Sequence, residues 1–126
     1  MTHSFPVTIY YEDTDMGGIV YHANFLKFIE RARSTWVAEL GVDQNALRDA
    51  GTVFVVRRIE AEYRAPARLG DRLDVRTTTD AKTPARWILR QEVWRAETEL
   101  FSALVTIVAM GTNGRPQRLP AALQDV

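Results

Sequence analysis

The chain contains no cysteine. That absence excludes disulfide bonds, thiolate nucleophiles and zinc-thiolate sites together, so any chemistry must come from oxygen and nitrogen groups. The sequence also lacks an uninterrupted run of eighteen apolar residues. Its first residues, MTHSFPVTIYYED, have neither the basic nor the apolar stretch of a signal peptide. We therefore expect a cytoplasmic protein that is not inserted in a membrane.

An excess of charge of one sign is missing as well. Sixteen Lys and Arg residues are balanced by sixteen Asp and Glu residues, so no overall field attracts nucleic acid or anionic lipid. We expect no nucleic-acid partner. The 126 residues are 46% hydrophobic and contain no repeat, which suits one domain, residues 1–126, with a real core.

Hydrophobic periodicity predicts the elements of this domain. Apolar residues alternate through Val7, Ile9 and Tyr11, which predicts a first strand that ends at an acidic segment. From residue 23 to 40 the apolar positions recur at helical spacing, and Gly41 is a natural stop. A short second helix is expected over 44–50 behind an Asp43 cap, followed by four strands and an irregular tail. The expected strands are residues 52–64, 72–80, 86–96 and 99–110.

This order of elements predicts an α+β fold. Four consecutive strands without intervening helices pair as antiparallel hairpins, and the resulting sheet must cover the one long helix. The economical arrangement curls the sheet around the helix. The far face of the sheet or its edge strands then require another subunit, so we expect an oligomer.

The most unusual segment is YYEDTDMGGIVYHAN, residues 10–24, which lies directly before the long helix. A calcium loop starting at Asp13 would need a bidentate Glu at its twelfth position, where this chain has Asn24. A phosphate loop would need a Lys-Ser or Lys-Thr pair after the glycines. We therefore expect no metal site. A solvated loop, whose acids only face the positive end of the helix, remains open.

Two features of this segment favour a catalytic site. Gly17 and Gly18 permit close approach of a ligand, and the first-turn N–H groups near Tyr21 and His22 have no partner within the helix. Asp15 is placed to face an acyl carbonyl held by those donors. A thioester suits such a site because its leaving thiolate is comparatively stable, the parent thiol having a pKa of about 8.5. We assign neither Glu12 nor Asp13 to the chemistry.

The stretch from Tyr11 to Asn24, followed by Glu30-Arg31-Ala32-Arg33, closely resembles the hotdog-fold acyl-CoA thioesterases of the 4-hydroxybenzoyl-CoA thioesterase type. Within that type it is most similar to the branch associated with the bacterial Tol-Pal envelope system. The likeness continues through FVVR at 54–57 and EYRAPARLGD at 62–71, and it spans roughly residues 5–120.

The resemblance implies a sheet wrapped around the central helix, dimers with sites at the subunit boundary, and a tetramer formed as a dimer of dimers. It implies hydrolysis of acyl-CoA, and of acyl carrier protein thioesters, without a cofactor, since coenzyme A is part of the substrate. Asp15 matches the family's catalytic carboxylate, acting as nucleophile or as general base; both routes stay open. The His22 N–H matches the group that polarises the carbonyl. The His22 imidazole and the Tyr11 hydroxyl match supporting residues.

The resemblance also implies contacts with the substrate. These are expected at Gly17, Gly18, Ile19, Val20 and Tyr21 and, for the phosphates of coenzyme A, at Arg57, Arg64, Lys82 and Arg86. The turn at residues 82–86 is less basic than in the 4-hydroxybenzoyl-CoA enzyme. Two other functions stay open: a hydratase or dehydratase on the same scaffold, and a non-catalytic acyl-CoA binding or scaffold protein.

Overall fold

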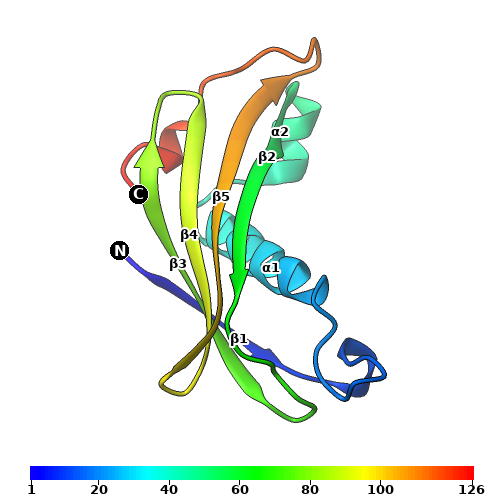
Figure 1. Ribbon diagram of the computed structural model, residues 1–126. Coiled ribbons are helices and arrows are strands. Elements are labelled where there is room, and N and C mark those ends of the chain that lie inside the picture. Colours follow the sequence, from blue (N-terminus) through cyan, green and yellow to red (C-terminus); the bar gives the residue numbers. More distant parts are fainter.

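One antiparallel sheet curls around one long helix in the computed structural model, which describes residues 1–126 (Figure 1). The sheet has the strand order β1-β3-β4-β5-β2, with every neighbouring pair antiparallel. Its strands are β1 (His3–Thr8), β2 (Thr52–Tyr63), β3 (Arg72–Lys82), β4 (Arg86–Arg95) and β5 (Thr98–Gly111). The helices are α1 (Asn24–Glu39) and α2 (Gln44–Asp49), with short 3-10 turns η1 (Tyr11–Asp13) and η2 (Ala121–Leu123). The predicted α+β class and wrapped sheet are confirmed.

The core lies between α1 and the concave face of the sheet. Helical spacing brings the apolar residues of α1 to one face, and alternate residues of β3, β4 and β5 point toward it. Five α1 residues and five β4 and β5 residues illustrate this: Phe25, Phe28, Ile29, Ala32 and Trp36, facing Trp87, Leu89, Phe101, Val105 and Ile107, all buried. Packing of α1 thereby fixes where its first turn stands relative to β2 and β5.

The first strand ends earlier than its alternation predicts. β1 stops at Thr8, and Tyr11 lies in η1 rather than in a strand, so the predicted extension through Tyr11 is wrong. The reason is local, because the Asp13 side chain accepts a hydrogen bond from the Tyr10 N–H at 2.9 Å and turns the chain. Ile9 is still held beside the sheet, since its N–H donates to the Asp71 carbonyl at 2.9 Å.

The other boundaries agree with the sequence to within two residues. Asp43 caps α2 as predicted, accepting hydrogen bonds from the N–H groups of Asn45 and Ala46 at 2.9 and 3.2 Å. Gly41 and Gly51 follow the two helices with positive φ angles of 93° and 99°, which glycine adopts without strain.

The tail after β5 is more ordered than the expected irregular segment. Leu119 and Leu123 are buried, and the tail includes η2. The Lys82 ammonium group donates to three tail carbonyls, those of Leu123, Gln124 and Val126, at 2.7, 2.7 and 2.6 Å. The tail is therefore fastened against the end of β3.

None of the helices has the length and apolar character needed to span a bilayer.

Candidate active site

The loop between β1 and α1 is held at both ends by Asp13. The Asp13 carbonyl accepts hydrogen bonds from the Tyr21 N–H at 3.0 Å and from the Asn24 side-chain amide at 2.9 Å, while its carboxylate holds the Tyr10 N–H. Each of these bonds joins Asp13 to the backbone or to the start of α1. The role of Asp13 in this structure is to shape the loop.

Asp15 lies at the tip of the same loop, and its side chain is exposed. Its backbone N–H donates to the Ile19 carbonyl at 2.9 Å, and its own carbonyl accepts from the Gly18 N–H at 3.0 Å. One carboxylate oxygen accepts from the Gly17 N–H at 2.8 Å. Gly18 needs its positive φ of 77° to close this turn. Asp15 takes part in none of the ion pairs, so its negative charge is not neutralised by a neighbouring side chain.

Of the four backbone N–H groups that directly precede α1, two donate hydrogen bonds within the chain and two do not. The Val20 N–H donates to the Ala67 carbonyl at 2.8 Å, and the Tyr21 N–H donates to Asp13. The N–H groups of His22 and Ala23 donate to no protein acceptor. Of the donors expected near Tyr21 and His22, the one on His22 is thus available, and Ala23 adds a second. Both stand at the positive end of the α1 dipole, where a developing oxyanion is stabilised.

An open groove of about 350 Å³ lies beside this first turn, between the loop and the end of β2. The predicted residues that line it are Ile19, Val20, His22 and Arg64. Tyr63 also lines it and was not predicted from the sequence. The groove walls do not include Asp15, Gly17, Gly18 or Tyr21, which belong to the adjoining loop.

The two expected supporting side chains are both exposed. The His22 ring makes edge contacts with the rings of Tyr21 and Tyr63, with centroid distances of 4.7 and 6.0 Å. Tyr11 is 80% exposed. Neither the His22 imidazole nor the Tyr11 hydroxyl is hydrogen-bonded to Asp15 within the single chain. Their assignment to the chemistry therefore stays a prediction.

Residues 10–126 match the family model of the thioesterase-like superfamily. The chain belongs to this superfamily. This chain is 38% identical over 120 residues to the acyl-CoA thioester hydrolase YbgC of Escherichia coli, and the match covers 94% of this chain and 90% of that protein. It is also 38% identical over 108 residues to the acyl-CoA thioesterase YbgC of Haemophilus influenzae, covering 85% of this chain and 79% of that one.

A solved structure supports the same assignment. The probable thioesterase of Bartonella henselae has a TM-score of 0.90 and 33% sequence identity, covering 95% of this chain and all of the other. The hotdog fold and the thioesterase family inferred from the sequence are thereby confirmed.

The four basic residues predicted to contact the phosphates of coenzyme A lie in different parts of the structure. Arg57 and Arg86 line one cavity of about 420 Å³ near the start of β2, and neither takes part in an ion pair. Arg64 lines the groove beside His22 and pairs with Glu62 and Glu99 at 3.1 and 3.4 Å. Lys82 is engaged by the tail, so a phosphate contact there would require its three carbonyl bonds to break.

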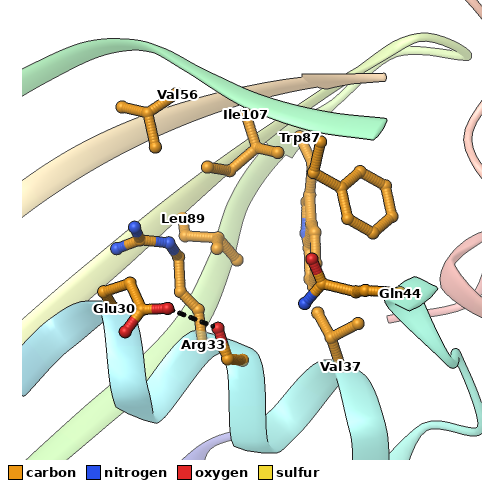
Figure 2. Close-up of a pocket in the computed structure, with 10 residues that line it drawn as sticks. Glu30, Arg33, Val37, Gln44, Val56, Trp87, Leu89 and Ile107 are labelled. Atoms are coloured by element: carbon orange, nitrogen blue, oxygen red, sulfur yellow. Dashed lines mark hydrogen bonds between the residues drawn. The ribbon is translucent and has the colours of Figure 1, made fainter. Parts of the chain in front are cut away.

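A further cavity, of about 200 Å³, lies between α1 and the sheet (Figure 2). Arg33 projects into it from α1, among apolar side chains that include Leu89 and Val56. Gln91, fully buried on β4, accepts a hydrogen bond from the Arg33 guanidinium at 3.1 Å and donates to the Ile29 carbonyl at 2.8 Å. Burial lowers the pKa of Arg33, although Glu30 acts in the opposite direction. No residue of the Asp15 loop lines this cavity.

Sequence reasoning missed Tyr63 and the Arg33–Gln91 pair for the same reason. Tyr63 reaches the carbonyl of a residue 41 positions earlier, and Gln91 joins a helix residue 58 positions earlier. A polar residue on the inward side of a strand, such as Gln91, is the only local signal. It indicates a buried hydrogen-bond network but does not name its partners.

Proposed function

We propose that the chain is an acyl-CoA thioesterase that hydrolyses acyl-CoA to a free acid and coenzyme A at the loop before α1. The observation that carries the proposal is the combination, on one short loop, of an exposed carboxylate without a cationic partner and two amide N–H groups without an acceptor. That combination occurs in a member of the thioesterase-like superfamily whose relatives carry acyl-CoA thioesterase names.

The chemistry assigns one role to each part of this loop. The acyl carbonyl accepts a hydrogen bond from the His22 N–H, which stabilises the negative charge that develops on the carbonyl oxygen. Asp15 then follows one of two routes. As a general base it takes a proton from water, whose oxygen bonds to the carbonyl carbon while the carbon–sulfur bond breaks. As a nucleophile it first forms a mixed anhydride, which water resolves. In both routes the thiolate leaves and is protonated.

No cofactor enters either route, because coenzyme A arrives as part of the substrate. The His22 imidazole and Tyr11 hydroxyl are assigned to orienting water and substrate, and residues 17–21 to contacts with the reacting end. The phosphates of coenzyme A are assigned first to Arg57 and Arg86, since these guanidinium groups share a cavity and have no competing carboxylate. Arg64 and Lys82 are weaker candidates because both are engaged within the chain.

A second copy of the chain is proposed to complete the assembly. β2 is an edge strand of twelve residues, and its residues Val56 and Tyr63 are 42% and 49% exposed. A long exposed edge strand has unpaired N–H and C=O groups that promote aggregation unless another strand covers them. We place a symmetric partner along β2 and two such dimers in a tetramer. Sedimentation equilibrium should give four times the chain mass of 14.3 kDa, and a monomer at micromolar concentration would contradict the assembly.

The remaining assignments concern the cell. We place the enzyme in the cytoplasm, where acyl-CoA and acyl carrier protein thioesters are available as substrates, and we associate it with the Tol-Pal system. The association rests on the resemblance to that branch, which spans roughly residues 5–120. Cell fractionation followed by immunoblotting tests the location, and enrichment with the membrane fraction would overturn it.

A direct assay of turnover tests the proposed activity. The protein should release free thiol from at least one member of a panel of straight-chain, branched and aromatic acyl-CoAs. Loss of enoyl absorbance from an enoyl-CoA without thiol release would instead establish a hydratase. Tight binding of acyl-CoAs, measured calorimetrically, without turnover of any substrate would establish a binding protein.

A further inference from the structure

Tyr63 joins the end of β2 to the first turn of α1. Its hydroxyl donates to the His22 carbonyl at 2.8 Å, and the ring of Tyr63 packs against Phe25 and Phe101 with centroid distances of 5.8 and 5.0 Å. The Phe25 N–H reaches the same carbonyl only at 3.3 Å. Of the two hydrogen bonds that the His22 carbonyl accepts, the one from the Tyr63 hydroxyl is therefore the shorter.

The His22 carbonyl and the Ala23 N–H belong to one peptide group. That group is planar and trans, so its C=O and N–H point in opposite directions and turn together. A bond that fixes the carbonyl also fixes the direction of the Ala23 N–H, which has no acceptor in the chain. A hydrogen bond accepted by an amide carbonyl also polarises the amide and strengthens its N–H as a donor.

We propose that Tyr63 is a positioning residue of the thioesterase site, acting through the His22–Ala23 peptide to make the Ala23 N–H a second donor to the acyl oxyanion. The inference rests on the proposed function, because it requires the reacting carbonyl to lie at the first turn of α1. The hydrogen-bond chain runs from the Tyr63 hydroxyl to the His22 carbonyl, and from the Ala23 N–H to the thioester oxygen.

The surroundings of Tyr63 suit this role. The aromatic contacts with Phe25 and Phe101 hold the ring, because both phenylalanines are buried in the core. A tyrosine hydroxyl, with an ordinary pKa of about 10, is protonated at neutral pH and is therefore a donor. Desolvation raises the pKa of Tyr63 further in the same direction. The exposed side of Tyr63 faces the groove that it shares with His22, which places it beside the path of the substrate.

The test compares Tyr63→Phe with Tyr10→Phe. The first substitution keeps the ring and removes the hydroxyl that bonds His22. The second removes the hydroxyl of a tyrosine that is 64% exposed, does not line the groove and bonds to the loop through its backbone N–H and carbonyl. We expect kcat of Tyr63→Phe to fall about 3- to 10-fold, the equivalent of one lost hydrogen bond, with KM nearly unchanged. Tyr10→Phe should keep the wild-type kcat and KM.

Infrared spectroscopy supplies a readout that a purely structural role would not move. The probe is a ketone analogue of an acyl-CoA substrate, with CH₂ in place of sulfur and a ¹³C-labelled carbonyl. Its carbonyl band should shift to lower wavenumber on binding to the wild type, and the shift should be smaller with Tyr63→Phe. A folded Tyr63→Phe protein with wild-type kcat and an unchanged band would overturn the proposal.

Asp15→Asn, assayed in the same series, separates this inference from the proposed function. If Asp15→Asn retains full activity, the reaction does not occur at this loop and the proposed function fails. If Asp15→Asn is inactive while Tyr63→Phe matches the wild type, only the role of Tyr63 is refuted.

Discussion

The Gly17 N–H donates to the Asp15 carboxylate at 2.8 Å, and a Cβ atom on residue 17 would lie 3.1 Å from that same carboxylate oxygen. Gly17 has no positive φ, so alanine is sterically allowed by the backbone there. We predict that Gly17→Ala folds normally but displaces the carboxylate and lowers kcat about 10-fold, since small misplacements of a reacting group are costly. Steady-state thiol release measures the loss.

Gly41→Ala is the control for this substitution. Gly41 follows the end of α1 that is opposite to the Asp15 loop and has a φ of 93°, so alanine there is strained and should lower the free energy of unfolding by about 1 kcal/mol. It should leave kcat unchanged. A Gly17→Ala enzyme with the wild-type kcat would show that the position of the Asp15 carboxylate is not critical.

The Asp71 carboxylate ties the loop before β3 to β4. Burial disfavours its charge, but hydrogen bonds from the Arg68 N–H at 2.8 Å and the Arg95 guanidinium at 2.9 Å outweigh burial and lower the pKa of Asp71. The pKa of Asp71 in the folded protein is below the unfolded value of about 3.9. The Asp71 carboxylate therefore contributes its full stabilisation of the fold above that pH. The contribution is lost as the pH falls through the folded pKa.

Asp71→Asn should therefore lower the free energy of unfolding by about 1–2 kcal/mol at pH 7, and the difference from wild type should shrink below pH 4. Urea denaturation at several pH values measures both effects. Asp49→Asn removes an exposed carboxylate whose partner Arg48 is 3.6 Å away, and it should change stability little at any pH. A pH-independent effect at Asp71 would refute the electrostatic explanation.

Gln91 and Arg33 form a polar link inside the core. Gln91→Met removes the acceptor of Arg33 and the donor to the Ile29 carbonyl and the Thr77 hydroxyl, leaving buried polar groups without partners. We predict a loss of about 2 kcal/mol in the free energy of unfolding. Arg33→Met in the same background should cost less than in the wild type, because its partner is already gone. Strictly additive losses, measured by urea denaturation, would show that the two residues are not coupled.

The fold was predictable wherever a local pattern carries the information. The inward residues Leu73, Val75 and Thr77 alternate along β3, and Asp43 and Gly51 bracket α2 as cap and stop. The end of β1 was not predictable from alternation. Tyr11 continues the apolar pattern, but the side-chain bond of Asp13 to the Tyr10 N–H competes with the sheet and turns the chain.

The segment that carries the candidate site was predictable from the sequence, but the hydrogen bonds within it were not. The motif singled out Asp15 and the His22 N–H, whereas the engagement of the Tyr21 N–H by Asp13 depends on how the loop closes. The bond from Tyr63 to His22 depends on the position of β2 at the sheet edge beside β5, which periodicity does not specify. Lys82 likewise had no local signal for its bonds to the tail carbonyls.

The central claim is that the Asp15 carboxylate performs the hydrolysis, and one comparison of kcat tests it most directly. Asp15→Asn and Glu12→Gln each remove one exposed charge from the same loop, and only the first should affect turnover. We predict that kcat for thiol release falls about 100-fold or more in Asp15→Asn and is unchanged in Glu12→Gln. A folded Asp15→Asn protein with the wild-type kcat would contradict the account.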